Sequence, residues 1–319
     1  MTEEIEKHIP LIVILGPTAV GKTEMSLKLA ERMDGEIVSA DSRLFYRGMD
    51  IGTAKPSREA RNRVPHHLID VADPDQVWNL AIYLREAKKA IKDIHQREKL
   101  PFLVGGTGQY IEALVEGWRI PEVRPDPAMR EILREWADEI GVDGLRRRLA
   151  SIDPEAARRI DGPNLRRMIR ALEVIFHSGE KFSEAQGKGP TPYHVLQLGL
   201  SRPREDLYER IDARIHAMLD QGLIEEVKNL LQEGYSPDLP PLSAIGYRQI
   251  IYYLQDVITL EEAIRQMKSR SHKYVRKQAN WFQKEDPEIT WFTVSENTVD
   301  EMEEEIQHFL INICYTENK

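Results

Sequence analysis

The 319-residue sequence has one cysteine, Cys314, and no run of the ~20 consecutive apolar residues that a membrane-spanning helix needs. A single cysteine cannot form an intrachain disulfide or a multi-cysteine zinc site. The first ten residues, MTEEIEKHIP, also lack the apolar stretch and the small-residue cleavage site of a secretory signal. We therefore expect a cytoplasmic protein without a membrane partner.

Net charge is absent from most of the chain. The formal total is −9, and residues 285–319 account for all of it, with ten Asp and Glu against one Lys. Within the neutral remainder, residues 146–170 hold eight Arg against three acidic residues, and residues 264–284 hold seven Lys and Arg against none. Because the location of charge decides partners more than the total does, both segments could contact a polyanion. Solvated helix faces are the alternative.

Short apolar segments alternate with helical ones along much of the chain. Residues 10–15 (PLIVIL) stop at Gly16 and predict a buried parallel strand, and residues 22–33 predict a helix. Strands are also predicted at 36–39, 67–71, 101–104, 194–200 and 289–294, with a helix at 79–94. This alternation predicts an α/β fold with a parallel sheet.

The strand pattern disappears between residues 119 and 190. Helix starts are predicted at Asp126-Pro127, at Asp153-Pro154 and at Asn164, and helix ends at Gly141, Gly162 and Gly179. The Gly- and Pro-containing segments 117–127 and 187–192 could serve as hinges. We therefore expect an α/β core of residues 1–118 and 191–319, ending in a basic helix, with an all-helical domain of residues 119–190 inserted into it.

Residues 16–23 (GPTAVGKT) match the phosphate-loop pattern G-x-x-x-x-G-K-[ST] between a predicted strand and a predicted helix. Glycines let backbone amides close around phosphate oxygens, Lys22 adds a full positive charge, and Thr23 offers a hydroxyl to Mg²⁺. The predicted phosphate-binding residues are Gly16, Pro17, Thr18, Ala19, Val20, Gly21, Lys22 and Thr23. NTPases, small-molecule kinases and transferases with a diphosphate leaving group can all use such a loop.

Two further segments follow predicted strands. Residues 39–55 (SADSRLFYRGMDIGTAK) place Asp41 at the carboxyl end of a strand, where neighbouring strands of a parallel sheet open onto one crevice. A turn or helix cap is the alternative role for Asp41. Residues 103–110 (LVGGTGQY) surround Thr107 with glycines, which permit close backbone approach to a ligand.

Together these segments resemble the tRNA dimethylallyltransferases, also called tRNA isopentenyltransferases. GPTAVGKT, DSRLFYRGMDIGTAKP, HHLIDV, LVGGTGQYIEALVEG, NLRRMIRALEV, RIDARIHAML and AIGYRQI follow in the order of that family, and the second string is the most specific. The chain departs from the common pattern at Trp78-Asn79 and at residues 276–281. One cysteine cannot build the zinc finger of many eukaryotic relatives, so the resemblance implies a bacterial-type member.

The resemblance implies transfer of a dimethylallyl group from dimethylallyl diphosphate to N6 of the adenosine 3′ of the anticodon (position 37 of tRNA), with pyrophosphate released and Mg²⁺ as cofactor. It implies that Asp41 is the base, that Thr107 lies near the target adenine and that Arg214 contacts the diphosphate. A carboxylate suits this chemistry because the attacking amine must lose a proton. The implied tRNA-binding residues are Asp41, Ser42, Arg43, Leu44, Arg166, Arg167, Arg170, Arg248, Arg276 and Lys277.

Helical periodicity gives the basic segments a packed face and a charged face. Around residue 168, Leu165, Met168, Ile169 and Leu172 would pack while Arg166, Arg167 and Arg170 face a phosphate backbone. In residues 264–284 the expected packed stripe is Ile264, Met267, Ser271, Tyr274, Gln278 and Trp281, with Arg265, Lys268, Lys273, Arg276 and Lys277 outside it. We expect this aromatic stripe to be core rather than a base-stacking surface.

Three other functions remain open. A small-molecule kinase would use the same loop, with Asp41 as base for a hydroxyl acceptor. An adenylate isopentenyltransferase of the cytokinin type would share donor and base but take a free nucleotide. The arginine-bearing insertion and the basic C-terminal helix exceed what a small acceptor needs. A non-catalytic RNA-binding protein leaves the phosphate loop without purpose. We therefore expect a monomer that binds dimethylallyl diphosphate and the anticodon stem-loop of tRNA.

Overall fold

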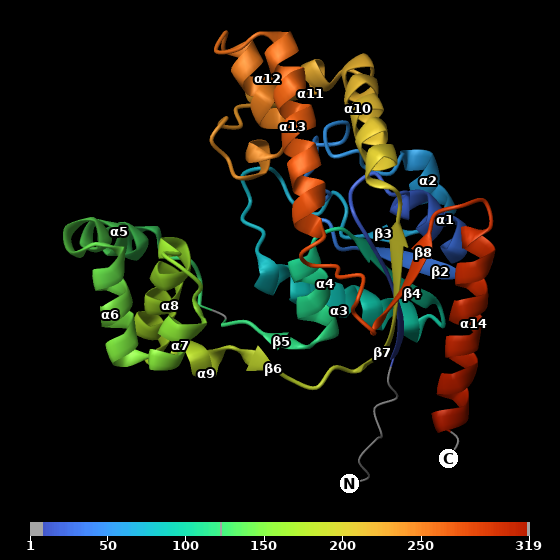
Figure 1. The fold of residues 1–319 in the computed structure, drawn as a ribbon, viewed down its shortest axis with the longest axis horizontal. Helices are drawn as coiled ribbons and strands as arrows, with labels where there is room; N and C mark the ends of the chain where they lie inside the picture. Colours follow the sequence, from blue (N-terminus) through green and yellow to red (C-terminus); the bar gives the residue numbers. More distant parts are fainter. Residues whose placement is uncertain (1–8, 122, 318–319) are drawn as a thin grey trace. The chain divides into compact units, whose positions relative to one another are not determined.

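A computed structural model describes residues 9–121 and 123–317, with the side chains of 315–317 left out. The chain divides into two compact units, residues 1–115 with 192–319 and residues 116–191 (Figure 1). The boundary residues expected for the insertion, 119 and 190, fall inside the second unit. The expectation that the N-terminus lacks a secretory signal rests mainly on residues 1–8, which lie outside the described residues. In the described part of the chain, no helix is long and apolar enough to cross a membrane.

A six-stranded sheet forms the centre of the first unit, in the order β3-β2-β4-β1-β7-β8. The strands are β1 (Ile9–Leu15), β2 (Gly35–Ser39), β3 (His66–His67), β4 (Leu100–Gly105), β7 (Tyr193–Ser201) and β8 (Ile289–Thr293). Every pairing between them is parallel, which confirms the predicted fold class. Residues 11–15 of β1 are at most 1% exposed, because this central strand is covered on both faces.

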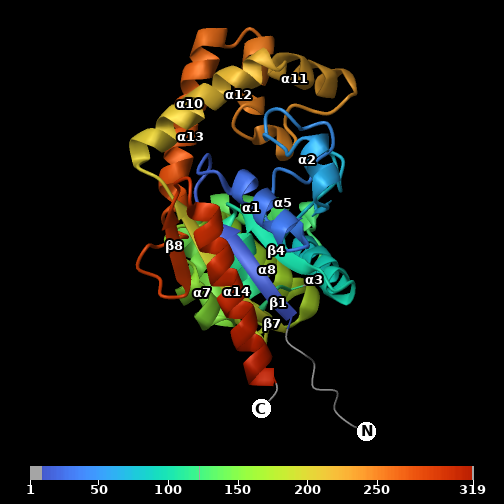
Figure 2. The same cartoon turned by 90° about the vertical axis from the view of Figure 1, so that its right-hand side faces the viewer.

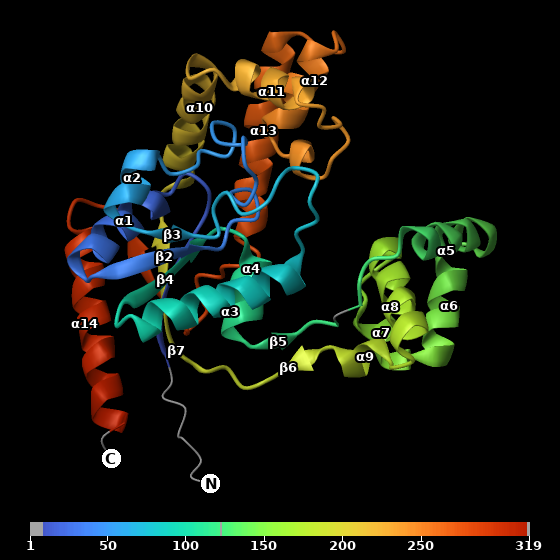
Figure 3. The same cartoon turned by 180° about the vertical axis from the view of Figure 1, so that it is seen from behind.

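Helices cover both faces of the sheet. α1 (Lys22–Arg32) and α14 (Thr298–Glu317) pack against each other on one face, which Figure 2 shows in front. α3 (Leu80–Gln96) and α4 (Gly108–Val115) pack against each other on the opposite face, visible in Figure 3. α2 (Arg58–Arg63) lies between β2 and β3 in the chain. The sheet is therefore buried on both faces, and the loops that follow β1, β2 and β4 lie at its carboxyl edge.

Four helices stand beyond the carboxyl edge of the sheet (Figure 1). They are α10 (Arg204–Asp220), α11 (Leu223–Gln232), α12 (Tyr247–Leu254) and α13 (Leu260–Gln278), with a 3-10 turn at Pro241–Ser243. They pack in sequence against one another, and α10 also packs against α13. We call this group the helical arm. The basic segment predicted at 264–284 therefore belongs mainly to α13.

One predicted strand is shorter than expected. Residues 67–71 were expected to be extended, but β3 ends at His67. Leu68 and Asp70 have φ angles of 62° and 57°, in the left-handed region that interrupts a strand. The apolar pattern there comes from Leu68 and Ile69, which are buried without belonging to the sheet.

The second unit contains α5 (Pro127–Ile140), α6 (Val142–Ile152), α7 (Pro154–Arg159), α8 (Leu165–Ser178) and α9 (Phe182–Ala185). Asp126, Asp153 and Asn164 accept hydrogen bonds from backbone amides at the starts of α5, α7 and α8, as their sequence positions predict. β5 (Trp118–Arg119) and β6 (Gly187–Lys188) add a short antiparallel ladder that periodicity did not predict. Leu133, Leu145, Leu149, Met168 and Leu172 lie in one apolar core.

Glu173 is a fully buried carboxylate in this unit. It accepts hydrogen bonds from Arg130 at 2.7 and 2.8 Å, from Arg170 at 2.6 Å and from the backbone amide of Asp126 at 2.8 Å. Burial alone would raise the pKa of Glu173, but these donors lower it to about 2.

Arg170 therefore differs from the expectation that it faces a phosphate backbone. Its guanidinium pairs with Glu173 and also donates to the carbonyl of Val123 at 2.9 Å. The side chains of Arg166 and Arg167 are exposed, as expected. The physical reason is that a buried carboxylate needs counter-charge, and Arg170 lies three residues before Glu173 on the same helix face.

Substitution of Glu173 by Gln should destabilise the second unit by about 3 kcal/mol at pH 7, because two guanidinium groups lose their buried counter-charge. The folded-state pKa is depressed, so this contribution is present above the usual glutamate pKa of ~4.3 and disappears as the pH falls toward about 2. Urea titration of the full chain, read by hydrogen exchange within residues 116–191, measures the change.

Glu131→Gln is the matched control, because Glu131 is exposed and pairs with Arg134 at the surface. A loss in Glu173→Gln no larger than in this control would contradict the assigned role.

Candidate active site

The phosphate loop lies between β1 and α1, as its pattern predicts. Three of its residues have positive φ angles, which are 143° at Gly16, 67° at Ala19 and 116° at Gly21. A side chain at Gly16 would place its Cβ 2.6 Å from the carbonyl oxygen of Leu200 on β7. Glycine is therefore required where the loop leaves the sheet.

The side chain of Lys22 folds back onto the phosphate loop and hydrogen-bonds to its backbone. Its Nζ donates to the carbonyl oxygens of Gly16 and Pro17, both at 2.9 Å. Burial lowers the pKa of Lys22 to about 8, opposed by the charge of Asp41 and reinforced by that of Arg214. The ammonium group is thus charged at neutral pH and poorly solvated, a state that an anionic ligand would stabilise.

Two arginines near the start of the helical arm donate hydrogen bonds to the phosphate loop. Arg202 Nε donates to the carbonyl of Val20 at 3.0 Å, and Arg210 Nε donates to that of Ala19 at 2.8 Å. Arg214 lies one turn after Arg210 on α10, and burial lowers its pKa while Asp41 opposes the shift. Sequence reasoning selected Arg214 but missed Arg202 and Arg210. The helical spacing of Arg210 and Arg214 was the available signal.

The loop after β2 brings Asp41 to the same edge of the sheet. Asp41 Oδ1 accepts the backbone amide of Arg43 at 3.0 Å, so the carboxylate does make the turn contact of the alternative interpretation. Thr107 is adjacent, because its Oγ1 accepts the amide of Ser42 at 3.4 Å and its own amide donates to the carbonyl of Ala40 at 3.3 Å. Gly105 permits this approach, since a Cβ there would lie 2.3 Å from the Ala40 carbonyl oxygen.

One cavity of about 960 Å³ brings these groups together. The predicted site residues that line it are Thr18, Ala19, Gly21, Lys22, Thr23, Asp41, Ser42, Arg43, Leu44, Thr107 and Arg214. Ammonium and guanidinium groups therefore share a space with a carboxylate and the hydroxyl of Thr107. Such an arrangement can hold an anionic leaving group while a carboxylate accepts a proton.

The sequence matches a known family over most of its length. Residues 44–285 match the sequence model of a family described as IPP transferase. The chain belongs to this family. A curated relative from Roseiflexus sp. (strain RS-1), named tRNA dimethylallyltransferase, is 52% identical over 276 residues, which cover 86% of this chain and 90% of the relative. The resemblance found in the sequence motifs is thereby confirmed.

Solved structures support the same family membership. The full-length tRNA isopentenylpyrophosphate transferase from Bacillus halodurans has a TM-score of 0.73 and 40% identity, covering 97% of this chain and 99% of that one. A eukaryotic dimethylallyltransferase, described as acting on tRNA, has a TM-score of 0.77 and 27% identity, covering 98% of this chain and 80% of that one.

Some predicted site residues of this IPP transferase family member lie away from the cavity. Gly16, Pro17 and Val20 belong to the loop but do not line it. Arg248 on α12 and Arg276 and Lys277 on α13 are exposed, and Arg276 donates to the hydroxyl of Tyr208 at 2.9 Å. Arg166, Arg167 and Arg170 belong to the second unit.

The predicted core stripe of α13 is wrong at its two aromatic residues. Tyr274 is 41% exposed and Trp281 is 39% exposed, whereas Val275 and Phe282, which the stripe omitted, are buried. The stripe fails because Tyr274 lines the cavity and because α13 ends at Gln278, before Trp281. Burial raises the pKa of Tyr274 to about 12.

Gln278 was expected only to pack, yet it joins two loops of the site. Its side-chain oxygen accepts the amide of Thr18, and its side-chain nitrogen donates to the carbonyl of Gly106, both at 2.9 Å. Because Gln278 is 3% exposed, these bonds lie out of water. Nothing in the apolar pattern of α13 could indicate two backbone partners so distant in the sequence.

The residues present fit a metal only in combination with a phosphate ligand. Within the described ranges, no group of three or more His, Cys, Asp or Glu could hold an ion. Thr23 lines the cavity at the start of α1 and offers one hydroxyl oxygen. Mg²⁺ commonly takes few protein ligands together with substrate phosphate oxygens and water, which agrees with this sparse donor set.

The affinity for dimethylallyl diphosphate should depend on pH through Lys22. The group is charged below its pKa of about 8 and loses its proton above it, and an anion binds the charged form better. We expect the dissociation constant to rise about tenfold per pH unit above pH 8. Calorimetric titration between pH 7 and pH 9.5 measures this slope.

Lys22→Arg supplies the control, because a guanidinium stays charged over the whole range. The same slope in this variant would assign the titration to another group.

Proposed function

We propose that this protein transfers a dimethylallyl group from dimethylallyl diphosphate to tRNA, at N6 of the adenosine 3′ of the anticodon, and releases pyrophosphate. The observation that carries the proposal is the cavity that unites Lys22 and Arg214 with Asp41. Family membership and the names of the relatives support the reaction type. The protein acts as a cytoplasmic monomer in this proposal.

The phosphate loop holds the donor. As the bond between the allylic carbon and oxygen breaks, negative charge accumulates on the diphosphate. Lys22, Arg214 and the loop amides stabilise this charge. Thr23 would hold Mg²⁺ together with the diphosphate, and the ion would supply further positive charge. Arg202 and Arg210 fix the loop carbonyls and so keep its amides directed toward the ligand.

Asp41 acts on the acceptor. The N6 amine forms a bond to the allylic carbon, gains positive charge and gives its proton to the carboxylate. Oδ1 already accepts the amide of Arg43, and no other hydrogen bond to this carboxylate occurs within residues 9–121 and 123–317. One oxygen therefore fixes the side chain while the other is free for the amine. Thr107 orients the adenine beside it.

The target adenine must leave its stack to reach this cavity. A single-stranded anticodon loop makes that step cheaper than it is in a duplex. Arg43 and Leu44 line the cavity beside Asp41, and the exposed Arg166, Arg167, Arg248, Arg276 and Lys277 would contact the phosphate backbone.

Separate incubations with different substrates test the function. Dimethylallyl diphosphate with bulk tRNA should add one five-carbon unit to an adenosine of tRNA, seen by mass analysis of the digested RNA. Prenylation of free AMP with no product on tRNA would indicate an adenylate isopentenyltransferase. Consumption of ATP in place of the prenyl donor would indicate a kinase. Either result overturns the proposal.

Asp41→Asn isolates the base. Asn keeps an oxygen for the amide of Arg43, so the turn should survive, but it cannot take a proton. We expect the transfer rate to fall by about 10²- to 10⁴-fold with little change in binding. A single-turnover measurement with saturating tRNA and donor checks this, because saturation removes binding from the comparison. A near-normal rate would leave Asp41 as a turn residue.

Arg166 and Arg167 test the tRNA contact of the second unit. Replacing both by Gln should weaken binding of every tRNA and reduce the slope of log affinity against log salt by roughly 1.4, if both contact phosphates of a single-stranded loop. Filter binding over a range of KCl concentrations gives the slope. An unchanged slope would mean that Arg166 and Arg167 are solvated charges on the helix surface and do not contact tRNA phosphates.

A further inference from the structure

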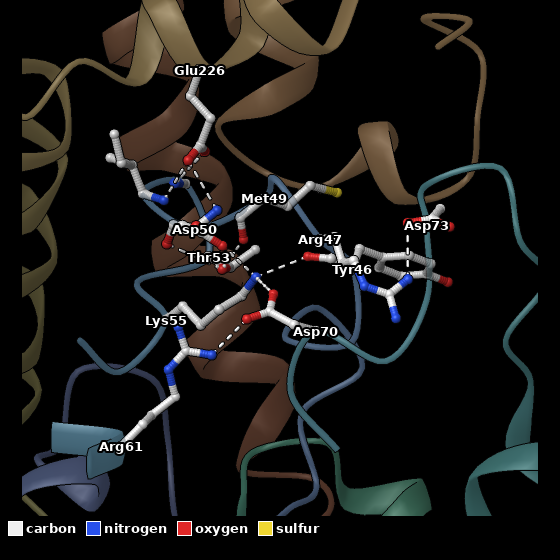
Figure 4. A network of polar contacts seen from close by, with 12 residues as sticks. Tyr46, Arg47, Met49, Asp50, Thr53, Lys55, Arg61, Asp70, Asp73 and Glu226 are labelled. Atoms are coloured by element: carbon white, nitrogen blue, oxygen red, sulfur yellow. Dashed lines mark hydrogen bonds and ion pairs between the residues drawn. The ribbon is translucent and has the colours of Figure 1, made fainter. Parts of the chain in front are cut away.

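Polar contacts that the proposed reaction does not use hold residues 50–55, in the loop that follows Asp41 (Figure 4). We call Asp50, Lys55, Asp70, Glu226 and Tyr247 the loop clasp. Glu226 lies on α11 and Tyr247 on α12, so the clasp joins the loop to the helical arm. Asp70 lies just after β3, so it also joins the loop to the sheet.

Glu226 provides the contact with the arm. Its carboxylate accepts the backbone amides of Asp50 at 2.9 Å, Ile51 at 2.7 Å and Gly52 at 3.1 Å. The hydroxyl of Tyr247 donates to it at 2.6 Å. Four donors nearly saturate the lone pairs of a carboxylate, and bonds to a charged acceptor are stronger than neutral ones.

The packing around this contact leaves no room for a side chain at residue 52. A Cβ at Gly52 would lie 2.5 Å from the ring of Tyr247 and 2.9 Å from Leu223. Tyr247 is completely buried, and burial together with Glu226 raises its pKa, so it remains a donor. The backbone of residues 50–52 is therefore pressed against the arm.

Lys55 holds the loop from the other side. Its side chain is 2% exposed, and its Nζ donates to the carbonyl of Tyr46 at 2.8 Å and to the carboxylates of Asp50 and Asp70. Asp70 also accepts from Arg61 at 2.5 Å. Burial alone would raise the pKa of Asp70, but these two cations lower it.

The clasp adjoins the cavity, and one of its members, Lys55, lines it. Gly52, Thr53, Ala54, Lys55 and Pro56 line the same cavity as Asp41. The helical arm lines it through Met267, Ser271 and Tyr274 of α13 and residues 243–245 before α12. Glu226 therefore fixes one wall of the cavity relative to another.

We propose that Glu226 is a positioning residue: by holding the amides of residues 50–52 against the arm, it sets the width of the cavity in which the acceptor base meets Asp41. This inference rests on the proposed function. It implies that loss of Glu226 impairs the transfer step and the use of tRNA while leaving the donor site intact.

Three variants test the proposal. In Glu226→Gln, one carbonyl oxygen must serve four donors and the amide nitrogen faces backbone N–H groups, so the clasp should open. Glu225→Gln is the matched control, because Glu225 is the exposed neighbour on the same helix. Glu226→Asp keeps the charge but shortens the reach by one methylene.

For Glu226→Gln we expect faster hydrogen exchange at the amides of residues 50–52 and a transfer rate lowered by about 10- to 100-fold, as a displaced reacting group would cause. The KM for tRNA should rise, whereas the dissociation constant for dimethylallyl diphosphate should stay that of the control. Glu226→Asp should show smaller changes of the same kind, a lower transfer rate and a higher KM for tRNA with unchanged donor affinity. This variant is used in place of Glu226→Gln if Glu226→Gln does not fold.

Two outcomes would overturn the proposal. One is a transfer rate equal to that of Glu225→Gln despite faster exchange at residues 50–52. The other is a loss of donor affinity that matches the loss of rate, which is the mark of general structural damage. Absence of transfer by the unsubstituted protein would overturn the proposed function instead, and hydrogen exchange would still report whether Glu226 holds the loop.

Discussion

The electrostatic interaction between Lys22 and Asp41 links the phosphate loop to the loop after β2, and hydrogen bonds to backbone hold the two side chains without an ion pair between them in the described residues. Burial lowers the pKa of Lys22 and the charge of Asp41 opposes this shift, so the two charges interact. Yet Lys22 is held by two carbonyls of its own loop and Asp41 by the amide of Arg43, and within the described residues they form no ion pair. In the proposed reaction the diphosphate would bind beside Lys22 and the amine beside Asp41, with the allylic carbon between them.

That separation depends on backbone that approaches closely at the carboxyl edge of the sheet. At Gly16 and Gly105 an added Cβ would lie within 2.6 Å of a carbonyl oxygen on a neighbouring strand or loop. The phosphate loop, the Asp41 loop and the Thr107 loop are therefore each anchored to a central strand. A parallel sheet brings these three loops together, because the carboxyl ends of all its strands lie at one edge.

The sequence predicted the elements that local pattern controls and missed the contacts between distant segments. The strands 10–15 and 101–104 and the caps at Asp126 and Asn164 follow from periodicity and cap chemistry, and the structure has them. Nothing local revealed that Arg130, 43 residues before Glu173, would join Arg170 at this carboxylate, or that Tyr274 would line a cavity. Glu226 and its amide partners are separated by more than 170 residues, so only the folded chain brings them together.

Side chains of the helical arm hold the loops of the site by hydrogen bonds to the loop backbone, not to the loop side chains. Gln278 binds the amide of Thr18 and the carbonyl of Gly106, and Glu226 binds three successive amides after Asp50. Main-chain groups are present whatever side chains the loops carry, so these bonds fix loop geometry without occupying Asp41, Ser42 or Thr107. The bond from Gln278 to Gly106 is buried and most of the others are partly buried, so losing them would leave poorly solvated polar groups and make the geometry costly to change. The side chains that face the cavity thereby remain free for substrate while the chain that carries them is held in place.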